Sequence, residues 1–333
     1  MELRGEEDLG VSVTRALTAD VRRTAEPLVS VVAPAYNEQA GVSDFSQAMT
    51  AALDGLGVRW EVVCVDDGST DRTFERLAAL HQADSRFKAL GLSRNFGKEA
   101  ALTAGLDHAA GDVIVPIDFD LQDPPELIGE MLALWREGND VVYATRRDRE
   151  GESWFKKRSA AWFYRVIGRM SSVPVPADTG DFRLMDRRVL ETLKRMKETH
   201  RFMKGLFAWV GYRQVSLPYV RKPRAAGETK WGYWKLWNFA VEGITGFSIA
   251  PLQIAAYLGF VVALAAFFYA LFIIAEVLLL GVDVPGYASL LVSVLFMGGV
   301  QLIGIGVVGE YVGRIYDEVK RRPLYVVDRT LGV

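Results

Sequence analysis

The chain has 333 residues, half of them hydrophobic, and its 39 basic residues nearly balance 41 acidic ones to give a formal net charge of -2. So apolar a chain can bury a sizeable core, which excludes an intrinsically disordered protein, and its basic residues are clustered in a few segments, unlike the broad basic surface of a nucleic-acid binder. The single cysteine, Cys64, excludes an intrachain disulfide, and no Cys/His spacing indicates a zinc site.

Residues 1–27 mix charges without an apolar run, so we expect a flexible cytoplasmic tail instead of a signal peptide or a membrane span. From residue 28 onward, short β-branched runs alternate with longer amphipathic runs, which predicts an α/β fold with a mainly parallel sheet flanked by helices. The expected strands are 28–34, 60–67, 87–93, 112–118 and 140–145, and the expected helices are 41–56, 72–84, 98–110 and 125–137.

Three polar clusters each follow one of these apolar strands directly. They are "PAYNE" at 34–38, "DDGSTD" at 66–71 and "DFDLQD" at 118–123. Because ligands of such sheets bind where parallel strands end at their carboxyl edge, the three clusters are expected to converge on one crevice.

The third cluster carries the pattern of a metal site. In an extended segment Asp118 and Asp120 point the same way, Gln122 continues that face, and Phe119 packs behind it. A hard divalent cation is commonly held by one or two carboxylates together with substrate phosphates, so the pattern predicts a site for one such cation beside a nucleotide diphosphate. Isolated D-x-D patterns are frequent in surface turns, and here the preceding buried strand favours a site. Asp123, ahead of two prolines, is expected to begin the next helix as its N-cap or as an acid of its first turn.

Aromatic and basic residues interleave at about 152–171, which predicts an amphipathic helix lying in a membrane interface. The alternative is a helix that covers the sheet and leaves a solvated basic face. A similar mixture at 231–245 precedes a long apolar run and predicts a second interfacial helix at the headgroup level.

Two uncharged runs, 243–275 and 284–309, each exceed the roughly 20 residues needed to cross a bilayer. They predict two transmembrane helices, and the alternative is a buried helical hairpin. Lys and Arg flank both runs but are missing from their connector, which places both flanks in the cytoplasm. The expected organisation is a catalytic domain at 28–230, a membrane domain at 246–312 with spans at about 247–277 and 285–311, and a cytoplasmic tail at 313–333. Gly304, Gly306 and Gly309 are interpreted as small residues for helix packing, and this span is a candidate contact for a homo-oligomer.

The ordered set "PAYNE", "DDGSTD", "DFDLQDPPE", "GDFRLMDR" and "RAAGETKWG" resembles family 2 glycosyltransferases of the GT-A fold. Within that family the chain is similar to the polyprenyl-phosphate glycosyltransferases, the group of dolichol-phosphate mannose synthase and the bacterial undecaprenyl-phosphate sugar transferases. The resemblance covers residues 28–321, and the Q-x-x-R-W motif of processive synthases is missing from the sequence. It implies an inverting enzyme that moves a hexose from a UDP-glucose or GDP-mannose type donor to undecaprenyl or dolichyl phosphate at the cytoplasmic membrane face, for cell-envelope glycan or protein glycosylation.

The resemblance also implies residue roles. The nucleotide-sugar residues would be Pro34, Tyr36 and Glu38, with Asp67 and Asp66 at the base or ribose. Asp118, Asp120 and Gln122 would hold Mg²⁺ or Mn²⁺ on the donor diphosphate. Arg224 and Lys230 would lie on a mobile loop that closes over the diphosphate; the alternative is a basic linker that binds anionic lipid. The acceptor phosphate would meet Arg147, Lys157, Arg158 and Ser159.

Asp181 is left with two interpretations of equal weight. It orients the acceptor or acts as its base, or it forms a structural ion pair with Arg183 or Arg187.

Two rival functions also stay open. One is a catalytically silent nucleotide-sugar-binding scaffold in the membrane, and the other is a transferase with a soluble or protein acceptor. Nucleic acid is not an expected partner.

Overall fold

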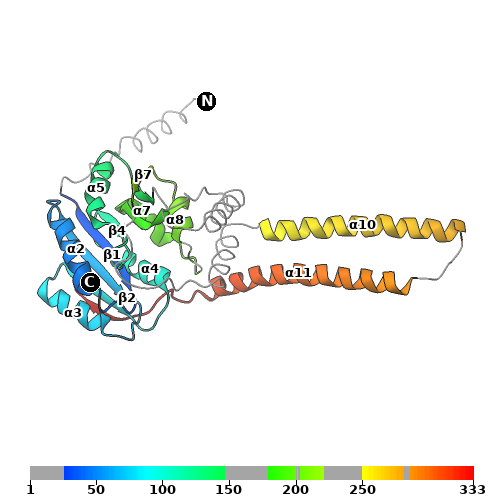
Figure 1. Ribbon diagram of the computed structural model, residues 1–333, viewed down its shortest axis with the longest axis horizontal. Helices are drawn as coiled ribbons and strands as arrows, with labels where there is room; N and C mark the ends of the chain where they lie inside the picture. Colours follow the sequence, from blue (N-terminus) through cyan, green and yellow to red (C-terminus); the bar gives the residue numbers. More distant parts are fainter. Residues whose placement is uncertain (1–25, 147–178, 200, 202, 221–249, 281–285) are drawn as a thin grey trace, which may run out of the picture.

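The computed structural model describes residues 26–146, 179–199, 201, 203–220, 250–280 and 286–333. A sheet with helices around it forms one end of the molecule, and two long helices extend away from it (Figure 1). The strands are β1 (Leu28–Ala35), β2 (Arg59–Asp66), β3 (Phe87–Leu92), β4 (Val113–Pro116), β5 (Val141–Arg146), β6 (Thr179–Asp186), β7 (Gln214–Tyr219) and β8 (Val327–Leu331). The helices are α2 (Val42–Asp54), α3 (Thr73–Ala83), α4 (Lys98–His108), the short 3-10 helix η1 (Pro125–Leu127), α5 (Ile128–Arg136), α7 (Arg187–Arg195), α8 (Met203–Trp209), α10 (Ala250–Leu280) and α11 (Tyr287–Lys320).

The sheet has the strand order β7-β5-β6-β4-β1-β2-β3-β8. Strand β1 pairs in parallel with β2 and β4, β2 with β3, and β5 with β7, whereas β6 runs antiparallel to β4 and β5 and β8 runs antiparallel to β3. The carboxyl ends of β1 to β5 therefore lie along one edge. The predicted fold class, a mainly parallel sheet flanked by helices, is confirmed.

Apolar side chains fill both faces of the central strands. Val31 and Val32 of β1 are both fully buried although they point to opposite faces, as expected where helices cover both sides. Helix α2 buries Phe45 and Met49 at helical spacing against one face. On the other face α4 packs so closely that a Cβ on Gly105 would lie 2.3 Å from Cγ1 of Val32. The close packing fixes α4 relative to the strand ends.

Glu61 is a buried carboxylate that joins the amino-terminal ends of several strands. Its Oε1 accepts hydrogen bonds from the Ser30 hydroxyl and from the Ala110 N–H, the latter at 2.8 Å. Its Oε2 lies 2.8 Å from Nζ of Lys88 on β3. These bonds satisfy a charge that burial alone would make costly.

The C-terminal segment belongs to the sheet. Residues 313–333, expected as a tail, continue α11 to Lys320 and then form β8 along the edge of β3. The Ser93 N–H donates to the Val326 carbonyl at 2.9 Å, and the Tyr325 hydroxyl donates to Asp107 at 2.7 Å. The pairing covers an edge strand that would otherwise expose unpaired backbone groups.

Helices α10 and α11 contact each other and lie side by side (Figure 1). Within them, the segments Pro251–Tyr269 and Phe296–Lys320 are long and apolar enough to cross a membrane, and protein buries none of either. Large apolar side chains such as Phe260 and Phe268 are mostly exposed. The two helices lie where the sequence predicts the spans. The expected interfacial helices at 152–171 and 231–245 are outside the described residues.

Candidate functional site

The loops that follow β1 and β2 are held together by hydrogen bonds. The Asn37 N–H donates to the Ser69 hydroxyl at 2.8 Å, and the Asn37 side-chain oxygen accepts from the Thr70 N–H at 2.9 Å. The Glu38 N–H donates to the Thr73 hydroxyl at 2.9 Å. Asn37 takes a left-handed backbone conformation, φ 57°, which asparagine tolerates better than most residues. The first two polar clusters thus form one surface.

A cavity of about 300 Å³ opens at this edge and receives side chains from all three polar clusters. Its lining residues are Pro34, Ala35, Tyr36, Glu38, Asp67, Asn95, Gly97, Lys98, Asp118, Phe119 and Asp120. Most of the nucleotide-site residues expected from the sequence are therefore brought together. Asp66 and Gln122 do not line this cavity, and both are buried.

The acidic motif, the DFDLQD cluster at 118–123, reaches the cavity through a turn and not through the extended segment that the sequence predicts. Strand β4 ends at Pro116, and Leu121 has a left-handed backbone with φ 53°. The Gln122 N–H then donates to Oδ1 of Asp120 at 3.1 Å. Phe119 packs behind the motif as expected, stacked on Phe45 with ring centroids 4.1 Å apart. The turn presents the Asp118 and Asp120 carboxylates to the same cavity.

These two carboxylates fit a hard divalent cation. Mg²⁺ and similar ions keep several waters and bind through one or two carboxylates together with substrate phosphates. In the part of the chain that the structure describes, no cluster of three or more His, Cys, Asp or Glu side chains forms a complete cage. A cation held here would therefore take its remaining ligands from water or from the substrate diphosphate.

Lys98, which the sequence analysis misses, lies between two carboxylates of this region. Its Nζ is 2.6 Å from Oδ1 of Asp118 and 2.7 Å from Oδ2 of Asp181. Lys98 begins α4 directly after Gly97, whose φ of 97° favours glycine. A signal was present, because a lysine in the first turn of a helix opposes the helix dipole and the preceding loop also follows a strand.

Burial and charge shift the pKa values of this trio. Burial lowers the pKa of Lys98, but Asp181 and Asp118 outweigh that effect and raise it above its ordinary value. Burial raises the pKa of Asp118 despite the favourable contact with Lys98. Burial would also raise the pKa of Asp181, yet Lys98 outweighs it and the pKa falls below its ordinary value. Asp181 is therefore ionised at neutral pH.

Asp67 positions the loop that carries Lys98. Its two carboxylate oxygens accept hydrogen bonds from the Phe96 N–H at 2.8 Å and the Gly97 N–H at 2.9 Å. Gly68, with φ 63°, allows the two loops to meet, because a Cβ there would lie 2.3 Å from the Arg94 carbonyl carbon. Asp66 is fully buried and accepts from the Ser69 N–H at 3.2 Å; burial raises its pKa.

The ion pair of Asp181 forms with Lys98 and not with the two arginines that the sequence suggested. The Arg183 guanidinium donates to the carbonyls of Gly180 at 2.8 Å and Asp181 at 3.3 Å. Arg187 donates to the Ala109 carbonyl and pairs with Glu191 at 2.9 Å. The remaining oxygen of Asp181, Oδ1, is buried without a hydrogen-bond partner among the described residues.

Two more cations lie near Asp181 and Asp118. Arg146, at the end of β5, interacts electrostatically with Asp123 and Asp118. Its Nε donates a hydrogen bond to the Tyr219 hydroxyl at 3.4 Å. Lys204, at the start of α8, interacts electrostatically with Asp181, Arg146 and Lys98; burial lowers its pKa. Their signal in the sequence was weak, because isolated basic residues are common on surfaces.

The expected N-cap role of Asp123 is wrong. Pro124 holds the cap position of η1 and no side chain caps that helix. The Asp123 carboxylate instead accepts a hydrogen bond from the Tyr219 hydroxyl, and both residues are buried. The acid in the first turn of that helix is Glu126, so Asp123 is neither its cap nor a residue of its first turn.

Residues 30–194 match the family model described as Glycosyl transferase family 2. The protein named "Uncharacterized glycosyltransferase sll0501" from Synechocystis is 54% identical over 305 residues, which cover 92% of this chain and 96% of the relative. The chain belongs to glycosyl transferase family 2. The "Bactoprenol glucosyl transferase" of Shigella phage SfII is 46% identical over 302 residues, covering 91% of this chain and 98% of that one. Among solved structures, the mannosyltransferase PcManGT from Pyrobaculum calidifontis, in complex with GDP-Man and Mn2+, is 19% identical with a TM-score of 0.46 over 88% of each chain.

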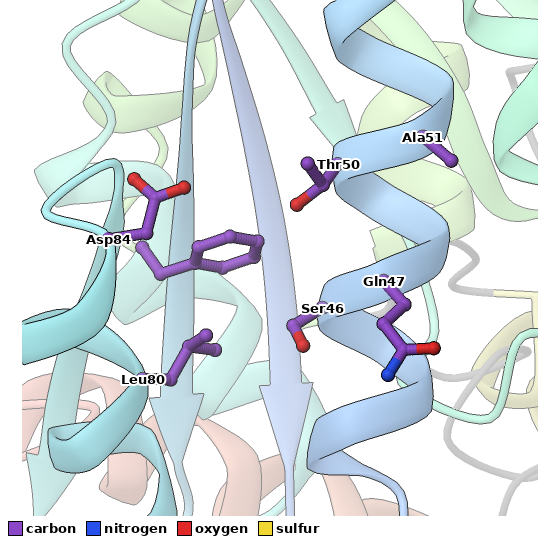
Figure 2. A pocket seen from close by; sticks show the side chains of 7 residues that line it. Ser46, Gln47, Thr50, Ala51, Leu80 and Asp84 are labelled. Carbon is purple, nitrogen blue, oxygen red and sulfur yellow. The ribbon is translucent and has the colours of Figure 1, made fainter.

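A second cavity of this family 2 glycosyltransferase, about 380 Å³, lies between α2 and α3. In Figure 2, Ser46 and Thr50 of α2 point towards Leu80 and Asp84 across the gap, and Gln47 also lines the cavity. Asp84 is already paired with Arg86 at 2.7 Å. The lining thus offers no uncommitted charge for a nucleotide sugar, and the crevice at the carboxyl edge is the candidate site.

The other expected site residues fall outside the described part of the chain. They are Arg147, Lys157, Arg158 and Ser159 for the acceptor phosphate, and Arg224 and Lys230 for the diphosphate. Their roles stay predictions for this glycosyltransferase. Arg147 directly follows Arg146, the last residue of β5.

Proposed function

We propose that the protein transfers glucose from a nucleotide diphosphate sugar to a polyprenyl phosphate, with inversion at the sugar. The observation that carries the proposal is the position of Lys98 between Asp118, on the cavity, and Asp181, beside further cations. The crevice thus has a carboxylate side suited to a cation and a diphosphate, and a basic side suited to a second phosphate. The substrate class is supported by the 46% identity to a bactoprenol glucosyl transferase along nearly the whole chain.

On the donor side, Pro34, Tyr36, Glu38 and Asp67 line the part of the cavity proposed for the nucleotide. Asp118 and Asp120 would hold Mg²⁺ or Mn²⁺, which supplies positive charge for the departing diphosphate. Gln122 stays a predicted third ligand, and its N–H already fixes the Asp120 carboxylate. Asp66 would hold the loop after β2 in place from the protein interior, because it is buried and accepts a hydrogen bond from the Ser69 N–H. Arg224 and Lys230 would add positive charge over the same diphosphate.

On the acceptor side, a polyprenyl phosphate is largely dianionic at neutral pH because the second pKa of a phosphate monoester is about 6. It therefore needs positioning and charge neutralisation more than deprotonation. Arg146 and Lys204 would supply positive charge there, together with the predicted Arg147, Lys157, Arg158 and Ser159. Asp181, ionised and paired with Lys98, would orient these cations.

The transfer is a single displacement. A phosphate oxygen of the lipid attacks the anomeric carbon and forms the new C–O bond. The bond from that carbon to the β-phosphate oxygen breaks, and the nucleoside diphosphate leaves with the electron pair. The chain's contribution is to hold both phosphates in line and to balance their charge.

The lipid acceptor also accounts for the two apolar helices. Exposed side chains such as Phe260 and Phe268 of α10 are stable in hydrocarbon and unfavourable in water. We place α10 and α11 across the membrane with the sheet and both termini in the cytoplasm, as the distribution of Lys and Arg in the sequence favours.

The test uses the full chain in detergent micelles or nanodiscs with a short-chain polyprenyl phosphate, Mg²⁺ or Mn²⁺, and either UDP-glucose or GDP-mannose. The expected result is a lipid whose mass rises by one hexose with UDP-glucose, and no product with Asp120→Asn. Lack of lipid product with every donor would overturn the proposal. Transfer only to a soluble sugar or peptide would indicate the non-lipid acceptor, and donor binding without turnover would indicate a silent scaffold.

A further inference from the structure

Lys98 occupies an unusual position for a cation in a site that suits a metal ion. Its Nζ contacts Asp118 at 2.6 Å and Asp181 at 2.7 Å, and these carboxylates come from different elements, the loop after β4 and strand β6. Lys98, Asp118 and Asp120 all line the same cavity. The ammonium therefore lies where a divalent cation on Asp118 would place its own charge.

A divalent cation and the ammonium cannot share this position at low cost. Two cations a few ångströms apart repel each other strongly, and the repulsion grows as the surrounding dielectric falls. Without any cation, Asp118 and Asp181 would face each other as like charges. The site therefore needs positive charge in every state, and its source can change.

The surroundings allow the ammonium to move without the backbone. Asp67 holds the Phe96 and Gly97 N–H groups, which fixes the start of α4. The Lys98 side chain is 46% exposed and has a flexible four-carbon stem. Rotation of that stem can break the contact with Asp118 and keep the contact with Asp181.

We propose that Lys98 takes the place of the divalent cation in the metal-free site, and that a cation binding at Asp118 displaces its ammonium to Asp181 alone. The inference rests on the proposed function, which puts the cation at Asp118 and Asp120. Arrival of the cation then moves one positive charge from the donor side of the crevice to the acceptor side, where Lys204 also interacts with Asp181. Lys98 is thus a positioning residue that prepares the second phosphate site.

The test measures Mn²⁺ binding to the full chain without nucleotide sugar, from the electron paramagnetic resonance signal of free Mn²⁺. Lys98→Met removes the competing charge and is expected to bind Mn²⁺ about tenfold more tightly than the parent. Lys98→Gln serves the same purpose should the methionine variant fold poorly. Lys98→Arg keeps the charge and is expected to show no tightening. The matched control is Lys88→Met, which removes the lysine paired with Glu61 away from the cavity.

Unchanged or weaker Mn²⁺ binding in both Lys98→Met and Lys98→Gln would overturn the inference, because Lys98 would then only hold the carboxylates in place. Lack of saturable Mn²⁺ binding in every form would overturn it too. If the parent protein glucosylates the lipid but the Lys98 variants do not bind Mn²⁺ more tightly, only this inference fails and the proposed function stands. If the parent protein transfers sugar from no donor, the proposed function fails, whatever its affinity for Mn²⁺.

Discussion

The hydroxyl group of Tyr219 donates a hydrogen bond to the carboxylate of Asp123, a residue 96 positions away in the sequence. Tyr219 lies at the end of β7, and Asp123 is the last residue of the polar cluster at 118–123. Arg146 donates to the same hydroxyl. This contact therefore joins an outer strand of the sheet to the loop that presents Asp118 and Asp120.

Replacing Tyr219 by phenylalanine is expected to destabilise the fold. The variant leaves the buried Asp123 carboxylate without this donor, which costs about 1–3 kcal/mol. A thermal unfolding midpoint lower by roughly 2–4 °C for each kcal/mol is the expected readout in detergent. Tyr36→Phe, which changes an exposed hydroxyl, serves as the control for stability. Equal midpoints for Tyr219→Phe and the parent would contradict the expectation.

Asp120 and Asp123 are expected to respond differently to the same substitution. Asp120→Asn removes a carboxylate from the cavity and should abolish transfer while the unfolding midpoint changes little. Asp123→Asn should mainly lower the midpoint, because its carboxylate accepts from Tyr219. Lipid mass and thermal unfolding measured on the same samples separate the two effects. Equal loss of transfer in both variants, with intact folding, would refute the distinction.

The strands and helices of the first half of the chain could be predicted because the local pattern of apolar residues determines where they begin and end. Strands β1, β2 and β3 begin and end within one residue of the ranges that the apolar runs indicate. Alternation of strand and helix also places the three polar clusters at one edge. The positions of these strands and of the polar clusters therefore follow from the local sequence.

The rest could not be read in this way, because it depends on long-range pairing. Strand β6 inserts between β4 and β5 in the antiparallel sense, and β8 reaches the sheet only after α11. The role of Lys98 was not predicted for the same reason, because Asp181, one of its partners, is 83 residues away in the sequence. Its local sequence marks it only as a lysine in the first turn of a helix and does not identify the two carboxylates that it meets.

Glu61 predicts a pH dependence of stability away from the site. Burial alone would raise its pKa, but Lys88, Ser30 and the Ala110 N–H together hold it below the ordinary value of 4.5. A lowered folded-state pKa contributes stability that is present above about pH 4.5 and is lost as the pH falls through the folded pKa. Glu61→Gln should be less stable at pH 7 and lose less on acidification.

Unfolding midpoints between pH 7 and the acid limit check this expectation. Glu137→Gln, a change of an exposed carboxylate, is the matched control and should follow the parent curve. If Glu61→Gln lost stability on acidification as steeply as the parent, the hydrogen bonds to Glu61 would not be the source of its acid sensitivity.

Because α4 packs closely against the sheet, one added methyl group at Gly105 is expected to destabilise the fold. Gly105→Ala would place a Cβ 2.3 Å from Val32 and 3.0 Å from Val65, so α4 must shift, at a cost of about 1–3 kcal/mol. Gly55→Ala is the matched control, because its nearest neighbour would be 3.8 Å away and its backbone is helical. Denaturation of both variants side by side gives the comparison. A Gly105→Ala protein as stable as Gly55→Ala would show that α4 is free to move.

Strand β8 returns the chain to the sheet after the proposed membrane domain. The chain leaves the sheet after β7, runs through α10 and α11, and returns to pair with β3. If the helices cross the membrane as proposed, a catalytic domain attached at two points would be unable to swivel about a single linker, and its crevice would keep one orientation towards the bilayer. A lipid phosphate acceptor would then reach the crevice by lateral diffusion in the membrane, without waiting for the domain to turn.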